Sequence, residues 1–149
     1  MTAVDVDPKG YRMVTGSLDY TMRMWDFHGM NRSMNSFRVT EPIEGNAIRN
    51  LTYNTSGTNV LVVCGGKQVM LADKEGAKGL LTVKGYMYIH NLHKTKEHTN
   101  TIYDGTFHPI NANEFVTCSG DGSIRLWDME QKLEGIEEEL GHKTLLRCL

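Results

Sequence analysis

The sequence predicts an all-β fold made of about three repeated antiparallel sheets of four strands each. Three observations support this class. Glycine outnumbers proline, with 15 residues against 3, which favours a β-rich chain with many hairpin turns. Two stretches of the sequence repeat each other in register. Short apolar strands alternate with turns, and no helical pattern lies between them, which argues against β-α-β units.

The repeat is clearest in residues 13–26 and 115–128, which read MVTGSLDYTMRMWD and FVTCSGDGSIRLWD. In both stretches Thr precedes Asp by four positions and Asp precedes Trp by six. A degenerate third copy lies between them, where the apolar run 60–64 turns at two glycines and Ala72 occupies the tryptophan position. The chain therefore contains three copies of one strand–turn–strand unit.

A histidine completes the repeated pattern. His98 lies 29 residues before Trp127, and Gly141-His142 stand where a further copy would begin. Together with the recurring Thr, Asp and Trp-Asp, these residues resemble the signature of the WD-repeat family. The resemblance is specific because the signature recurs in register. It implies a β-propeller, whose blades are four-stranded antiparallel sheets.

The repeat length follows from three equivalent first-strand residues, Val6, Tyr53 and Phe107. Their gaps of 47 and 54 residues slightly exceed the ~40–45 of a typical blade. We expect blade one at about 1–40, blade two at about 46–84, blade three at about 100–140 and the start of a further blade at 141–149. Because known propellers have about four to eight blades, we expect a partial propeller that stays open because the chain is a fragment. For residues 131–149 the sequence does not decide between an outer strand, a helix and disorder.

Among WD-repeat proteins, several stretches of the sequence resemble the gastrulation-defective family in particular. They are Asp19-Tyr20, Trp25-Asp26-Phe27, Ser36-Phe37-Arg38, Thr95-Lys96-Glu97-His98-Thr99 and Thr117-Cys118-Ser119. Glu97 replaces the family's glycine before the histidine, and residues 131–140 do not match the family. The resemblance implies a non-enzymatic scaffold for protein–protein interactions in nuclear, chromatin or DNA-damage-related complexes. It implies a location in the nucleus, with the cytoplasm as the alternative.

The signature residues predict a structural hydrogen-bond network. A buried indole N–H needs an acceptor, and a threonine hydroxyl can accept from Trp while donating to a histidine nitrogen. The other histidine nitrogen can donate to the Asp that caps its turn. We therefore expect a chain of Trp127, Thr117, His98 and Asp121 in blade three. The equivalents in blade one are Thr15, Asp19 and Trp25, and their histidine would precede Met1.

The same residues also permit catalytic and metal-binding interpretations. Ser119, His98 and Asp121 could be drawn as a hydrolase triad, and Cys118 with His98 as a thiol dyad. The Thr-Asp-Trp part occurs twice, as expected of a structural brace and not of a unique active site. His90, His93 and His98 lack a neighbouring carboxylate or cysteine at ligand spacing, so we predict no metal and no catalytic residue.

Bulk properties exclude several classes of partner. The net charge is -2, so a nucleic-acid-binding propeller remains only an alternative and nucleic-acid contact is expected to be at most indirect. No apolar run approaches the ~18 residues of a membrane span, and no secretory signal is found at the N-terminus. We expect other proteins as partners, with no cofactor, no membrane and no small-molecule substrate.

The partner surface is expected beside the network, where the His98 loop and the Asp121 turn meet. Four residues flank these anchors without being needed in the network: Leu18, Tyr20, Asn100 and Tyr103. Tyrosines are enriched where protein partners dock. The alternative is that both tyrosines pack against neighbouring blades.

Overall fold

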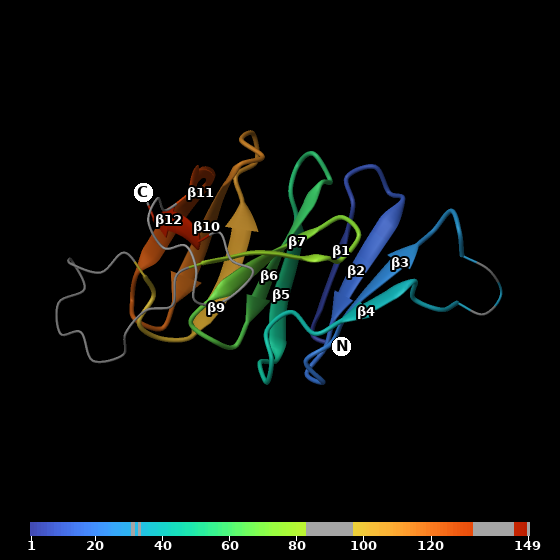
Figure 1. Ribbon diagram of the computed structural model, residues 1–149, viewed down its shortest axis with the longest axis horizontal. Coiled ribbons are helices and arrows are strands. Elements are labelled where there is room, and N and C mark those ends of the chain that lie inside the picture. Colours follow the sequence, from blue (N-terminus) through green and yellow to red (C-terminus); the bar gives the residue numbers. More distant parts are fainter. Residues whose placement is uncertain (31, 33, 83–96, 133–144, 149) are drawn as a thin grey trace.

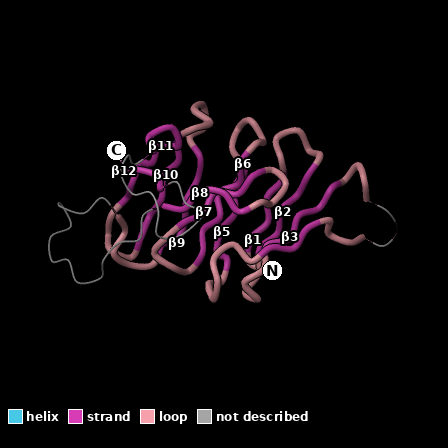
Figure 2. Tube along the Cα trace, viewed as in Figure 1, coloured by secondary structure: helices cyan, strands magenta, loops and turns pink. Residues whose placement is uncertain are grey.

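The computed structural model describes residues 1–30, 32, 34–82, 97–132 and 145–148. Every regular element within these ranges is a β-strand, as Figure 2 shows, so the prediction of an all-β chain is confirmed. The strands form three antiparallel units that stand side by side along the molecule (Figure 1). In the part of the chain that the structure describes, no helix is long and apolar enough to cross a membrane.

Blade one is a four-stranded sheet in simple sequence order. Its strands are β1 (Ala3–Val6), β2 (Arg12–Gly16), β3 (Met22–Asp26) and β4 (Arg38–Thr40). Trp25 pairs with Met13 and Arg23 pairs with Thr15 across the β2–β3 hairpin. Because cross-strand partners share one face of a sheet, Thr15 and Trp25 lie on the same side.

Blade two contains the most buried strand of the molecule. Its strands are β5 (Ile48–Tyr53), β6 (Asn59–Cys64), β7 (Val69–Asp73) and β8 (Lys78–Thr82). The run from Val60 to Cys64 is buried on both faces, because a blade stands on each side of it. That position explains why its sequence is a continuous apolar run and does not alternate with polar residues.

Blade three contains β9 (Ile102–Phe107), β10 (Glu114–Ser119), β11 (Ile124–Lys132) and β12 (Leu145–Cys148). We expected residues 141–149 to start a further blade, but β12 pairs antiparallel with β11 as the outer strand of blade three. It also pairs in parallel with β8, which joins blades two and three into one eight-stranded sheet. The open edge of β11 offers unpaired backbone groups, and β12 satisfies them. Most of the segment 131–140 lies outside the described residues.

Each blade has a forward face, toward the next blade along the chain, and a backward face, toward the preceding one. The forward face of blade one packs on the backward face of blade two through Val14, Met22 and Met24 against Val60, Val62, Met70 and Ala72. Blade two repeats the contact with blade three through Leu61, Val63, Val69 and Leu71 against Ile102, Phe107, Phe115 and Trp127. The first contact is so close that a Cβ added to Gly16 would overlap Ile48.

The first strands of the three blades lie next to one another and carry polar links between blades. The Thr2 hydroxyl donates to the Ile48 carbonyl at 2.6 Å, and the Tyr53 amide donates to Asp5 at 2.6 Å. The Asn50 side chain donates to the Gly105 carbonyl at 3.3 Å. These bonds fix the blades relative to one another, so the loops at the strand ends form one continuous edge.

Candidate functional site: a braced loop edge

The four signature residues of blade three form a chain of buried hydrogen bonds. Trp127 Nε1–H donates to Thr117 Oγ1 at 2.7 Å. Thr117 Oγ1 lies 2.7 Å from His98 Nε2, and His98 Nδ1 lies 3.2 Å from Asp121 Oδ2. All four side chains are buried, at no more than 2% exposure of the side chain for His98 and Asp121. The network ties the loop before β9 to the β10–β11 turn.

The donors and acceptors, together with burial, favour one arrangement of protons. Trp127 Nε1–H can only donate, so the Thr117 oxygen accepts from it. The Asp121 carboxylate can only accept, so His98 Nδ1 carries a proton. Because burial lowers the pKa of His98, the ring is neutral, and its unprotonated Nε2 accepts the Thr117 hydroxyl proton. Every polar atom of the network then has a partner.

Asp121 organises the turn as well as the histidine. Its Oδ2 accepts the Thr99 amide at 3.0 Å, and its Oδ1 accepts the Ser123 amide at 2.9 Å and the Ser123 hydroxyl at 2.6 Å. Gly122 follows with φ +79°, the left-handed conformation that glycine adopts without steric cost. Sequence reasoning missed Ser123. The signal was present, because a hydroxyl residue follows the turn Asp by two positions in both repeats, as Thr21 and Ser123.

Burial and hydrogen bonding lower the pKa of both His98 and Asp121, in agreement with this arrangement of protons. Burial lowers the pKa of His98, and it outweighs the hydrogen bond that His98 donates to Asp121 and the negative charge of that carboxylate, both of which raise the pKa. Burial by itself would raise the pKa of Asp121, but the hydrogen bonds from Ser123, Thr99 and His98 together lower it well below its usual range. A neutral imidazole beside an ionised carboxylate is the result.

Blade one holds the same residues without a histidine. Trp25 Nε1–H donates to Thr15 Oγ1 at 3.0 Å, but the Thr15 hydroxyl reaches the Arg23 carbonyl only at 3.5 Å. Asp19 is exposed and accepts the Thr21 hydroxyl at 2.7 Å, and the side-chain and backbone hydrogen bonds of Thr21 lower its pKa. Thr15 and Asp19 thus belong to two separate clusters. In blade three the equivalent Thr117 and Asp121 are joined through His98.

Blade two replaces the network with apolar residues. The strand register aligns Val62 with the threonines and Ala72 with the tryptophans. Gly66 stands at the position of the turn aspartates. Both Val62 and Ala72 are buried against blade one. The equivalent strands fold the same way without the brace, so the network is an addition to the blade and not a condition for its fold.

The atoms that the alternative catalytic arrangements would need already form other hydrogen bonds. Both ring nitrogens of His98 are bonded within the network, while the Ser119 hydroxyl donates to the carbonyls of Asn100 and Thr101 at 3.1 and 3.0 Å. Cys118 lies on the opposite face of β10 from Thr117, with its sulfur 3.7 Å from the Asp104 carbonyl oxygen. Among the described residues no three His, Cys, Asp or Glu side chains gather as metal ligands, and His90 and His93 lie outside them.

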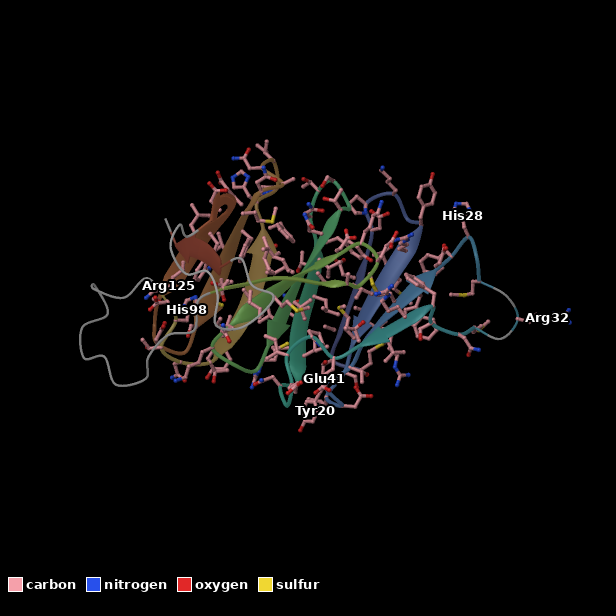
Figure 3. The ribbon with its side chains drawn as sticks, in the orientation of Figure 1. Tyr20, His28, Arg32, Glu41, His98 and Arg125 are labelled. Atoms are coloured by element: carbon pink, nitrogen blue, oxygen red, sulfur yellow. The ribbon has the colours of Figure 1, made fainter. Side chains whose placement is uncertain are left out.

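The four predicted surface residues are all exposed: Leu18, Tyr20 and Asn100 lie in turns and loops, and Tyr103 lies near the start of β9. Asn100 donates to the Gly120 carbonyl at 3.3 Å, and the Tyr103 ring lies beside the same glycine with Arg49 stacked 5.4 Å from its centre. Leu18 and Tyr20 occupy the equivalent turn of blade one, and Tyr20 stands at the lower edge of the molecule in Figure 3. Tyr20 and Tyr103 retain 43% and 53% of their surface, although Arg49 of blade two covers part of the Tyr103 ring.

Comparisons with known proteins agree with this geometry. The family described as "WD domain, G-beta repeat" matches residues 1–26 and 89–128. WD repeat-containing protein 70 of Xenopus tropicalis is 41% identical over 138 residues, which cover 91% of this chain and 22% of that protein. The human protein of the same name is 39% identical over 130 residues, covering 87% of this chain and 20% of its own length. Gastrulation defective protein 1 homolog of Drosophila melanogaster is 42% identical over 121 residues, covering 81% and 18%.

Solved structures show the same fold. The β-propeller domain of Cps50 (Swd1) from Myceliophteria thermophila superposes with a TM-score of 0.65 at 22% identity, covering 87% of this chain and 36% of that chain. The chain spans about a fifth of the length of the curated relatives it matches. It is a WD-repeat chain whose strands form blades of a β-propeller, and its sequence is similar to part of WD repeat-containing protein 70.

Proposed function

We propose that the chain is a non-enzymatic scaffold that binds a protein partner along the loop edge carrying Leu18, Tyr20, Asn100 and Tyr103. The observation that carries the proposal is that both tyrosines are exposed beside the turns, in blade three next to a buried anchor. Asp121 is sealed within its network, while Tyr20 and Tyr103 beside the anchors remain exposed. A rigid frame that presents large amphipathic side chains lowers the entropy cost of binding.

The backbone of Tyr20 supports a binding role. Tyr20 has φ +68° and directly follows Asp19, whereas the equivalent position after Asp121 is Gly122. A left-handed conformation costs a bulky residue roughly 1–2 kcal/mol, and such strain is concentrated at functional sites. A large exposed aromatic at a position that suits glycine is better explained by contact with a partner than by the fold.

The absence of catalysis is part of the proposal. Hydrolysis in the style of a triad would need His98 to take a proton from Ser119, but Thr117 occupies the accepting nitrogen and backbone carbonyls occupy the hydroxyl. The gastrulation-defective likeness supports a place in nuclear, chromatin or DNA-damage-related complexes. Fractionation of cells that express a tagged full-length protein tests this, and a cytoplasmic pool without a nuclear one would contradict it.

The partner surface is tested by changing Tyr20 and Tyr103 to Ala in the tagged protein. We expect the co-purifying partner to be lost while the melting temperature stays the same. Ile110→Ala is the matched control, because Ile110 is exposed in the β9–β10 loop, at the other end of blade three. Full recovery of the partner by the double variant would contradict the proposal. A large fall in melting temperature would return the tyrosines to a packing role.

A further inference from the structure

Two equivalent bulges place one large side chain each on the loop edge where blades two and three meet. In β5 the pairing with β6 skips Arg49, because the residues on either side of it pair with the consecutive residues Cys64 and Val63. In β9 the pairing with β10 skips Tyr103 in the same way. A bulge adds one residue to a strand and re-aims its side chain, and bulges are frequent beside functional sites. Both bulge residues are exposed, although the isoleucine before each of them is fully buried.

A glycine at the equivalent position of each blade makes room for these two side chains. A Cβ on Gly65 would lie 3.3 Å from Arg49 Nε, and a Cβ on Gly120 would lie 3.0 Å from the Tyr103 ring. The amide of each glycine also donates to the backbone carbonyl just before the bulged strand, at 2.8 Å in blade two and 2.9 Å in blade three. The same local structure therefore holds both side chains, and it is made by residues of blades two and three alone.

The Arg49 guanidinium rests on the Tyr103 ring with its donors unused. Its central carbon lies 5.4 Å from the ring centre, a cation–π contact that holds the group across the boundary between the blades. Among the residues that the structure describes, the Arg49 side chain forms no hydrogen bond and no ion pair. The carboxylate of Asp104, beside Tyr103 in sequence, accepts instead from the Asn50 side chain and the Gly105 amide. The guanidinium is thus held in place but has no acceptor within this part of the chain.

The shape and charge of this group favour a carboxylate as its ligand. A guanidinium is planar, and its paired N–H donors match the two oxygens of a carboxylate. Lys67, in the β6–β7 turn that also contains Gly65, adds a second positive charge on this edge. Phosphate groups are usually bound by clusters of arginine. Here a single arginine stands near the negative charge of Asp104, which disfavours a dianion more than a carboxylate.

We propose that Arg49 and Tyr103 together bind a carboxylate from an acidic segment of the protein partner. The carboxylate pairs with the guanidinium, and the partner chain packs on the part of the tyrosine ring that Arg49 leaves exposed. The assignment of Arg49 rests on the proposed partner surface, which contains Tyr103, and it adds the residue that selects the chemistry of the partner. The partner is therefore a protein segment rich in Asp or Glu.

Fluorescence anisotropy of labelled hexaglutamate and hexaglutamine peptides with the full-length protein tests the proposal. The wild-type protein should bind hexaglutamate about tenfold more tightly than hexaglutamine, as expected of hydrogen bonds to a charged group. Arg49→Gln should remove this preference without changing the melting temperature, because the side chain is exposed. Arg49→Lys should retain only part of it, because an ammonium group lacks the planar pair of donors.

Arg12→Gln is the matched control for Arg49→Gln. The Arg12 guanidinium also lies on an aromatic ring, 5.5 Å from the centre of Phe37, but it stands at the other end of blade one. Its Nη1 already donates to the Lys74 carbonyl at 2.8 Å. This variant removes the same charge from the protein, so it should keep the preference for hexaglutamate.

Three results would overturn the carboxylate site: no preference for hexaglutamate in the wild-type protein, an undiminished preference in Arg49→Gln, or an equal loss in Arg12→Gln. The partner surface is judged separately, by the variant with both Tyr20 and Tyr103 changed to Ala. If that variant loses its co-purifying partner while Arg49→Gln keeps both the partner and hexaglutamate, the surface stands and the carboxylate site falls. Full recovery of the partner by the tyrosine variant would overturn the surface itself.

Discussion

Blades one and three carry the same threonine, aspartate and tryptophan, but only blade three joins them. In blade three His98 bridges Thr117 and Asp121 at 2.7 and 3.2 Å, and all the side chains of this network are buried. In blade one the Trp25–Thr15 bond remains at 3.0 Å, while Asp19 sits in an exposed turn with Thr21. The histidine is the residue that converts two local motifs into one brace across the loop edge.

The comparison also separates fold from reinforcement. Blade two has valine, alanine and glycine at the network positions and still forms the same four strands. Apolar packing between blades is therefore enough for the fold. The brace adds a fixed position for the turn, which matters for the proposed partner surface because Tyr103 stands next to it.

The largest contrast is expected from removing the two tryptophans. Trp127→Ala should lower the free energy of unfolding by about 3–5 kcal/mol, because it empties a buried site and removes the indole N–H that donates to the Thr117 oxygen. Trp25→Ala should cost clearly less, because Trp25 is only half-buried. Urea unfolding followed by circular dichroism measures both. Equal losses would mean that burial and the network do not distinguish the blades.

A smaller contrast is expected from the two turn aspartates. Asp121→Ala leaves the buried His98 Nδ1–H and the Thr99 amide without their acceptor, which should cost about 1–3 kcal/mol. Asp19→Ala removes only exposed bonds and should stay within about 0.5 kcal/mol. The paired variants are compared by thermal unfolding. An Asp121→Ala chain of unchanged stability would remove the aspartate from the brace.

The buried histidine also makes stability depend on pH. Because burial lowers the pKa of His98 in the folded chain, the unfolded chain takes up a proton that the folded chain refuses as the pH falls below about 6.5. The contribution of neutral His98 is fully present above that pH and declines below it. His98→Gln should reduce the slope of stability between pH 7 and 5, in the range that the unfolded pKa sets.

The smallest effect concerns the strained turn of blade one. Tyr20→Gly should raise the free energy of unfolding by about 1 kcal/mol, because glycine adopts φ +68° without the steric cost that tyrosine bears. The same change should weaken partner binding if the proposed surface is right. A loss of stability would show that the Tyr20 side chain packs well enough to repay its backbone strain.

The sequence predicted much of this architecture because the repeat is periodic. The spacing of Thr117, Asp121 and Trp127, with His98 upstream, points to a network that the structure contains with those partners. Ser123 was not predicted, because the signature pattern does not include the hydroxyl residue that recurs two positions after each aspartate. The left-handed backbone of Tyr20 could be read only from coordinates, since sequence alone places no tyrosine at positive φ.

The position of β12 could not be predicted from the sequence, for a different physical reason. Its pairing with β11 depends on which strand edge lies open in space, and periodicity carries no information on that.

The tautomer of His98 tests the central claim most directly. A long-range nitrogen–proton NMR spectrum of the chain labelled with ¹⁵N at histidine distinguishes the two neutral forms from the charged one. The bonding of Thr117 and Asp121 predicts a neutral ring at neutral pH with its proton on Nδ1. A proton on Nε2, or a doubly protonated ring, would contradict the brace, because Thr117 could not then donate to His98 while accepting from Trp127.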